Sequence, residues 1–95
     1  TLKGAHGAST DGVLSEYLVI DDTAIAPAPA GLGDAEAAAL PTAGLTAWTA
    51  LNAGGPIAPG DVVLVQGTGG VSTFALQFAA AAGAKVIVTS SSDEK

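Results

Sequence analysis

The sequence predicts an α/β protein that ends in a parallel βαβ unit, and the last third of the chain carries the supporting pattern. Residues 62–66 and 85–89 are rich in aliphatic side chains, as expected of parallel strands that are covered on both faces. Between them lie a glycine-rich break at 67–70 and a stretch, 71–82, whose apolar residues recur at helical spacing. This order predicts two parallel strands joined by a right-handed crossover helix.

Two short segments delimit these elements. Gly83 follows the predicted helix and suits the left-handed conformation in which many helices end. Pro59-Gly60-Asp61 predicts a turn before the first strand.

The first thirty residues predict loop and extended chain. Residues 1–12 are rich in Gly, Ser and Thr and predict a loop. Residues 13–20 contain β-branched and aromatic side chains and predict a strand. Residues 24–30 contain Pro27 and Pro29, which restrict them to an edge strand or a polyproline-like segment.

Two helices are expected before the βαβ unit. Asp34 is suited to cap a short helix over 35–40, which Leu40-Pro41 should end or kink. A second helix is expected over 42–53, where Gly54-Gly55-Pro56 ends it.

The composition fits one small domain with a weak core. Of the 95 residues 48% are hydrophobic, but 21 of these are alanine. An alanine buries one methyl group and contributes far less than the roughly 1.5–3 kcal/mol of a buried Val or Leu. We therefore expect this chain not to close a good core alone.

Charge and hydropathy exclude several classes. The formal net charge is -6, whereas a nucleic-acid binder needs clustered cations. No apolar run reaches the roughly 18 residues of a membrane helix, and the N-terminus does not resemble a signal peptide. We expect no nucleic-acid or membrane partner and a cytoplasmic location. Cysteine is absent, which excludes disulfides and thiolate zinc sites within the chain.

The glycine-rich break predicts a dinucleotide site. It matches the first two glycines of G-x-G-x-x-G and has serine at the third. The first glycine permits a tight turn, the second lets the backbone approach a pyrophosphate, and the third position needs a small side chain. The following helix offers free N–H groups and a positive dipole end. The predicted cofactor-binding residues here are Gly67, Gly69, Gly70, Val71 and Ser72.

The glycine turn has three other interpretations. The glycines could merely shape a βα turn. A P-loop is disfavoured because no Gly-Lys-Ser/Thr follows. An S-adenosylmethionine site is disfavoured because such sites usually keep an acid after the second strand, where this chain has Ser90-Ser91-Ser92.

The same serines favour NADP(H) over NAD(H), although NAD(H) stays open. NAD-specific sites usually place Asp or Glu after the second strand to bind the ribose 2′-hydroxyl. The hydroxyls of Ser90 and Ser91 could instead donate to a 2′-phosphate, and Lys95 could add a cation. The alternative is that residues 90–93 simply cap a following helix.

Other polar residues give weaker signals. His6 stands alone in the predicted loop, and Asp21-Asp22 is more simply a solvated turn than a catalytic pair.

Several blocks resemble the medium-chain dehydrogenase/reductase superfamily, especially its alcohol-dehydrogenase-like and quinone-oxidoreductase-like members. The blocks are ALPTAGLTAWTAL at 39–51, PGD at 59–61 and VQGTGGVS at 65–72. GVLSEY at 12–17 resembles the strand that precedes this region in those enzymes. The resemblance covers residues 12–95 at the spacing of the family.

The resemblance implies a Rossmann domain, a doubly wound parallel sheet, preceded by the end of a GroES-like β-barrel. Residues 1–41 would be the C-terminal part of that catalytic domain, and residues 42–95 the N-terminal part of the NAD(P)-binding domain. Members of the family are several times longer, so we expect a fragment that is inactive alone and forms a homo-oligomer when full length. The catalytic residues and early zinc ligands would lie outside this chain.

Some residue roles follow from the resemblance. Thr46 matches a threonine beside the nicotinamide, Ser90 matches the NAD-selecting acid, and Lys95 matches a lysine near the adenosine ribose. Thr42 stands where zinc-dependent members have a cysteine ligand, and a hydroxyl is a poor replacement for thiolate on zinc. We therefore expect no zinc.

The expected function is hydride transfer between NADP(H) and a small carbonyl, quinone or enone substrate. A zinc-dependent alcohol dehydrogenase and a non-catalytic nucleotide-binding fragment are the alternatives.

Overall fold

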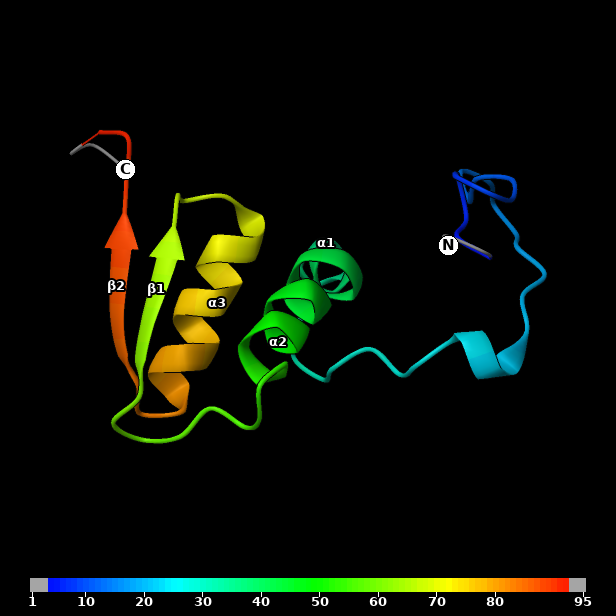
Figure 1. Cartoon of the computed structure of the whole chain (residues 1–95). Coiled ribbons are helices and arrows are strands. Elements are labelled where there is room, and N and C mark those ends of the chain that lie inside the picture. Colours follow the sequence, from blue (N-terminus) through cyan, green and yellow to red (C-terminus); the bar gives the residue numbers. More distant parts are fainter. Residues whose placement is uncertain (1–3, 93–95) are drawn as a thin grey trace.

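The computed structural model describes residues 4–92, which form a two-stranded parallel sheet and a set of helices (Figure 1). The elements in chain order are the 3-10 turn η1 (Asp22–Ala24), α1 (Asp34–Ala39), the π-helical segment η2 (Leu40–Gly44), α2 (Leu45–Asn52), β1 (Val62–Gln66), α3 (Gly70–Ala81) and β2 (Lys85–Thr89). None of these helices is long and apolar enough to cross a membrane.

The predicted βαβ unit is confirmed. β1 and β2 pair in parallel, from Val62 opposite Lys85 to Gln66 opposite Thr89. Both strands have the bounds that the aliphatic runs predict, and α3 connects them along one face of the sheet (Figure 1). The helix begins and ends one residue earlier than its apolar spacing predicts, which is within the usual uncertainty of helix ends.

At the end of the unit where α3 leads into β2, Gly83 has the left-handed conformation that the sequence predicts. Gly83 has φ +81°, and a Cβ there would lie 3.3 Å from the Cβ of Pro59. The N–H of Gly60 donates to the carbonyl of Gly83 at 3.2 Å, and the N–H of Lys85 donates to that of Asp61 at 2.8 Å. The 59–61 turn is therefore locked against the end of α3.

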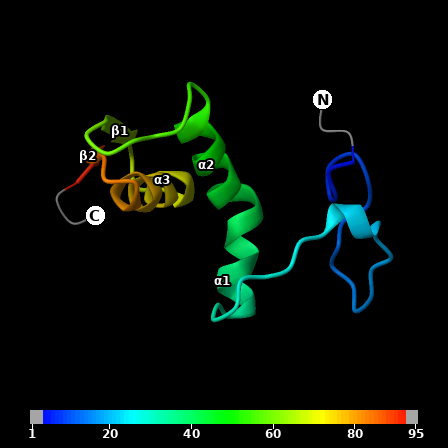
Figure 2. The ribbon, with the colours of Figure 1, turned by 90° about the horizontal axis from the view of Figure 1, so that it is seen from below.

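The two predicted helices are joined by a bend, which is one of the two outcomes that Leu40-Pro41 predicts. Figure 2 shows α1 and α2 following one another as a single bent helix, with η2 between them. Pro41 has no N–H to continue the α-helical pattern, and the N–H of Leu45 bonds back to the carbonyl of Leu40, five residues earlier. The predicted start of the second helix at Thr42 is wrong, because the widened turn of η2 extends to Gly44 and α2 begins at Leu45.

The start of α1 also differs from expectation. Gly33 is the N-cap, and Asp34 is the first helical residue. No side chain makes the capping bond that we expected of Asp34. The Glu36 carboxylate instead accepts a hydrogen bond from the N–H of the N-cap residue Gly33 at 2.8 Å, which is the return bond of a capping box.

The strand predicted over residues 13–20 is not formed. This segment bends at Ser15 and Glu16 and pairs with no described strand, and Leu14 and Val19 are fully exposed. Strand propensity expresses side-chain packing against neighbours, and it does not produce a strand where no partner strand is present.

The core is small, as the alanine content predicts. Ala47, Val65 and Ala79 are the buried apolar side chains among residues 4–92. Beside them the Phe78 ring meets the Trp48 ring edge-on, with the ring centroids 5.7 Å apart. This core lies where α2, α3 and β1 meet.

The sheet is covered on one face only. α3 packs on the face that contains Val65, while Val62 and Leu64 of β1 and Ile87 of β2 are about half exposed. The expectation that the aliphatic strands are covered on both faces is thus wrong for this part of the chain, because no described segment reaches the second face.

Candidate functional site

The glycine turn lies at the edge of the sheet where both parallel strands end (Figure 1). Gly67 has φ +84°, a conformation that an L side chain rarely adopts. Its N–H donates to the carbonyl of Thr89 at 3.0 Å, which ties the turn to the end of β2. The structure therefore brings the two sequence-predicted parts of the site, the turn and the serines from Ser90 onward, to one edge.

Gly69 is glycine for a different reason. It is the N-cap of α3, with φ -78° and ψ 178°, which any residue can adopt. A Cβ at Gly69 would meet no protein atom within 4 Å. Neither backbone strain nor packing requires glycine here, so its effect is to leave open the space at the start of the helix. This open cradle fits the close backbone approach of a dinucleotide diphosphate.

The first turn of α3 presents hydrogen-bond donors to that space. The first bond of the helix runs from the Thr73 N–H to the Gly69 carbonyl at 2.9 Å. The N–H groups of Gly70, Val71 and Ser72 make no hydrogen bond within the described part of the chain, and no side chain caps this helix. Free donors at the positive end of a helix dipole favour a bound anion.

The start of α3 is backed closely by η2. A Cβ on Gly70 would lie 3.5 Å from the Cβ of Ala43, and one on the buried Gly44 would lie 3.7 Å from Cε1 of Phe74. Small residues on both sides therefore let the two segments approach. Thr42 lies in η2, and Thr46 follows in the first turn of α2; both are exposed. Thr46 makes no side-chain hydrogen bond to the described residues and is free to contact a ligand.

Ser72 has a role that its small size alone does not reveal. Its hydroxyl donates to the backbone carbonyl of Gln66, six residues earlier, at 2.9 Å. The sequence pattern identified Ser72 as a substitute for the third glycine, but the partner becomes visible only when the turn folds back on β1.

Ser90 closes a local turn after β2. Its hydroxyl donates to the carbonyl of Ser92 at 2.8 Å and accepts the Ser92 N–H at 3.3 Å. This is the type of capping bond that the alternative interpretation of the serines expects. Ser91 is exposed. Lys95 and Asp93 lie outside the described residues.

The remaining polar candidates form local contacts. Asp21 accepts hydrogen bonds from the Thr23 hydroxyl at 2.7 Å and the Thr23 N–H at 2.9 Å, and these hold the pKa of Asp21 below its ordinary value. Asp21 therefore stabilises a turn, as expected. The Nδ1 of exposed His6 lies 3.3 Å from the Thr10 hydroxyl. Residues 4–92 contain no cluster of three or more His, Asp or Glu that could hold a metal.

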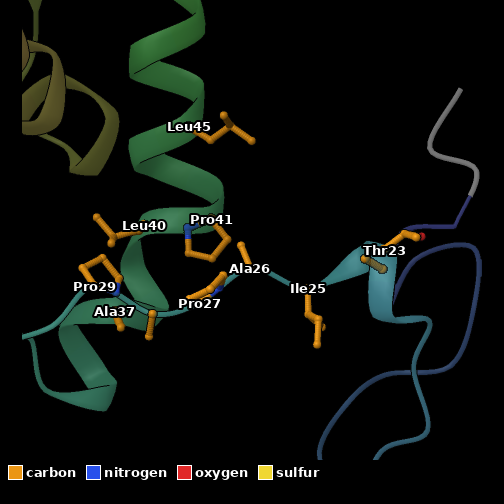
Figure 3. A pocket seen from close by; sticks show the side chains of 11 residues that line it. Thr23, Ile25, Ala26, Pro27, Pro29, Ala37, Leu40, Pro41 and Leu45 are labelled. Atoms are coloured by element: carbon orange, nitrogen blue, oxygen red, sulfur yellow. The ribbon is translucent and has the colours of Figure 1, made fainter.

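An apolar hollow lies away from the glycine turn. It has a volume of about 700 Å³ and lies between residues 23–29, which include the end of η1, and the helical residues of α1, η2 and α2. In Figure 3, Pro27 and Ala26 face Pro41 across it, whereas Ile25 points elsewhere. Its lining contains no titratable side chain, so it supplies shape and apolar surface but no acid or base.

The fold and the turn thus define a class: an α/β chain whose parallel βαβ unit carries a dinucleotide-type glycine turn. No protein-family model matches the chain. A zinc-type alcohol dehydrogenase-like protein of Schizosaccharomyces pombe is 54% identical over 93 residues, which cover 96% of this chain and 27% of that protein.

Two solved structures are also similar. A protein assigned as an alcohol dehydrogenase from Sinorhizobium meliloti 1021 is 57% identical with a TM-score of 0.84, over 90% of this chain and 25% of that one. The quinone oxidoreductase from Thermus thermophilus, solved also in complex with NADPH, is 40% identical with a TM-score of 0.76, over 90% of this chain and 28% of that one.

The chain belongs to the medium-chain dehydrogenase/reductase superfamily, and it spans about a quarter of the length of these relatives. The resemblance found in its sequence blocks is thereby confirmed.

Proposed function

We propose that this chain is the cofactor-binding start of an NADP(H)-dependent oxidoreductase that transfers hydride to a carbonyl, quinone or enone substrate. The observation that carries the proposal is the open cradle at Gly69, toward which the free N–H groups of the first α3 turn are directed. The similarity to a quinone oxidoreductase solved with NADPH, and to alcohol dehydrogenase-like proteins, supports it.

Each part of the cofactor has candidate partners in this chain. The diphosphate would lie on the N–H groups of Gly70, Val71 and Ser72, with Gly67 shaping the turn and Gly69 leaving room. Ser90 and Ser91, with Lys95, would meet the ribose 2′-phosphate, and Thr46 would lie toward the nicotinamide. The bound nicotinamide supplies or accepts the hydride, while the protein positions and orients it.

Ser90 would have to exchange partners to serve this role. Its hydroxyl proton is directed to the Ser92 carbonyl, so donation to a phosphate requires that bond to open. A charge-assisted bond to phosphate is roughly twice as strong as a neutral one, which favours the exchange.

We also propose the domain boundary that the resemblance implies. Residues 1–41 would end a GroES-like barrel, and residues 42–95 would begin a Rossmann domain. The exposed apolar side chains of the unpaired segment 13–20 and the exposed face of the sheet support this, because further strands and helices would cover both.

Zinc independence is part of the proposal. Thr42 stands in η2 at the position of a family cysteine ligand, and a threonine hydroxyl is a poor zinc ligand. The rival function, a zinc-dependent alcohol dehydrogenase, is favoured by the zinc-type name of the S. pombe relative.

The test is a binding and turnover assay on the whole protein. NADPH and NADH are titrated by their fluorescence, and oxidation of the bound dinucleotide is followed with an aldehyde, a quinone and an enone. We expect tighter binding of NADPH and turnover with at least one acceptor. Binding without turnover on any acceptor would favour the non-catalytic alternative, and absence of binding to either dinucleotide would contradict the proposal.

A further inference from the structure

We propose that Ser72 is a positioning residue for the diphosphate-binding turn, a role that rests on the proposed function and adds to it. The Ser72 hydroxyl donates to the Gln66 carbonyl at 2.9 Å. Gln66 is the last residue of β1, and Ser72 lies in the first turn of α3. One side chain thus joins the two ends of the glycine turn.

The direction of the Gln66 carbonyl explains why it needs this donor. The Gly67 N–H donates to the Thr89 carbonyl, and the Lys85 N–H donates to the Asp61 carbonyl. Because backbone groups alternate sides along a strand, the odd-numbered residues of β1 face β2, and Gln66 faces the opposite edge. The sheet of the described residues has two strands, so β2 cannot reach this carbonyl and Ser72 satisfies it.

The turn therefore has two separate anchors. On the β2 side, Gly67 is held by its hydrogen bond to Thr89 at 3.0 Å. On the other side, Ser72 holds the helix start to β1. Gly69 lies between the anchors, and a Cβ at this position would meet no atom within 4 Å. Without the Ser72 hydroxyl, only the Gly67 bond holds the glycine turn. The orientation of the first N–H groups of α3 toward a diphosphate then becomes less well defined.

Thr73 provides a matched comparison in the next position. Its hydroxyl also donates to backbone carbonyls, those of Gly70 at 2.9 Å and Gly69 at 3.2 Å. These acceptors lie within one turn of the same helix, so the bonds are local and do not join α3 to β1.

The experiment compares Ser72→Ala, Ser72→Thr and Thr73→Ala in the whole protein. NADPH binding is measured by fluorescence titration, and adenosine 2′-monophosphate, which has no diphosphate, is measured by displacement of NADPH. Loss of a neutral hydrogen bond should raise the Kd for NADPH about two- to tenfold in Ser72→Ala. Ser72→Thr, which keeps the hydroxyl, and Thr73→Ala should stay near the wild type. Affinity for adenosine 2′-monophosphate should not change in any variant.

The outcomes separate this role from the proposed function. A wild-type protein that binds neither NADPH nor NADH contradicts the function itself. If the wild type binds NADH only, NADH and adenosine replace the two probes. Where the wild type binds, the role of Ser72 is overturned by unchanged affinity in Ser72→Ala, by equal weakening of both probes, or by failure of threonine to restore binding.

Discussion

Gly67 and Gly69 lie two residues apart in the same turn and are glycine for different reasons. At Gly67 the backbone itself requires it, because φ is +84°. At Gly69 the backbone is extended and a Cβ would meet no atom within 4 Å, so neither strain nor packing within the described residues requires glycine. We propose that Gly69 serves ligand binding, whereas Gly67 serves the fold.

Gly69→Ala should therefore weaken cofactor binding without weakening the fold. The added methyl lies where the diphosphate would approach, and loss of even one charge-assisted hydrogen bond, about 1.5–3 kcal/mol, corresponds to roughly a ten- to hundredfold rise in Kd for NADPH. Unfolding by urea should be unchanged or slightly harder, because alanine restricts the unfolded chain. Gly54→Ala is the control, since its Cβ also meets open space but lies far along the chain from the turn. Equal affinity in the two variants would argue against a ligand at Gly69.

Ser90→Asp should change the choice of cofactor. The carboxylate would accept a bond from the 2′-hydroxyl of NAD and repel the 2′-phosphate of NADP. If the unmodified protein prefers NADPH by roughly ten- to hundredfold, as one charge-assisted bond allows, the variant should lose or reverse that preference. The measurement is a pair of dissociation constants at fixed salt, with Ser9→Asp in an exposed loop as the control for added charge. If the wild type binds both cofactors with equal affinity, Ser90 does not select the cofactor, and its role is the local turn in which it bonds Ser92.

At the scale of elements, close contacts at the two ends of α3 position the helices relative to the sheet. The π-helical η2 lets α1 run into α2 past Pro41, and it brings Ala43 and Gly44 against the start of α3. At the other end of α3, Gly83 turns the chain into β2 while it packs on Pro59. Both contacts need small residues where two segments approach closely. Replacing these residues with larger ones should therefore lower the free energy of unfolding.

Gly83→Ala should destabilise the protein more than Gly60→Ala. Both glycines have positive φ, so alanine at either position costs about 1–2 kcal/mol of left-handed strain. Only Gly83 adds a contact at 3.3 Å from Pro59, whereas a Cβ on Gly60 meets open space. Urea unfolding of the whole protein should rank Gly83→Ala as the most destabilised, then Gly60→Ala, with Gly54→Ala near the wild type. If Gly60→Ala is instead the more destabilised variant, the contact between a Cβ at residue 83 and Pro59 adds nothing to the loss of stability.

At the scale of the whole molecule, the described chain is an α/β unit with much exposed apolar surface. Its buried side chains are small, one sheet face is half exposed, and residues 13–20 pair with no described strand. The chain spans about a quarter of the length of the relatives that it matches. We propose that the catalytic residues of the whole protein lie outside this chain, as the family resemblance implies.

For the whole protein, zinc removal tests whether the activity depends on zinc. The resemblance places Thr42 where zinc-dependent members have a cysteine ligand, and we therefore propose that the purified whole protein keeps its activity after dialysis against a chelator. Elemental analysis before and after, with a zinc-dependent alcohol dehydrogenase treated in parallel, measures this. Stoichiometric zinc whose removal abolishes activity would restore the zinc-dependent alternative.

Most of the βαβ unit was predictable because its determinants are local. Aliphatic runs, helical spacing and Gly83 each act within a few residues, and the strands appear where they predict. The π-helical segment was not predicted because a proline ordinarily ends or kinks the helix that precedes it. The bond from the Leu45 N–H to the Leu40 carbonyl, which carries the chain past Pro41, is visible only in the structure. Residues 13–20 were predicted as a strand from side chains alone, but a strand also needs a partner.

The sequence by itself determined the family, the order of the last three elements and the glycine turn, because each of these depends on residue type at fixed spacing. Only the tertiary structure showed that the Ser72 hydroxyl bonds the end of β1, that Gly69 faces open space and that Ser90 bonds Ser92. These facts depend on where the backbone folds back on itself. The order of residues does not show which groups form a hydrogen bond across a turn. It also does not show whether a side chain at a glycine position would meet other atoms.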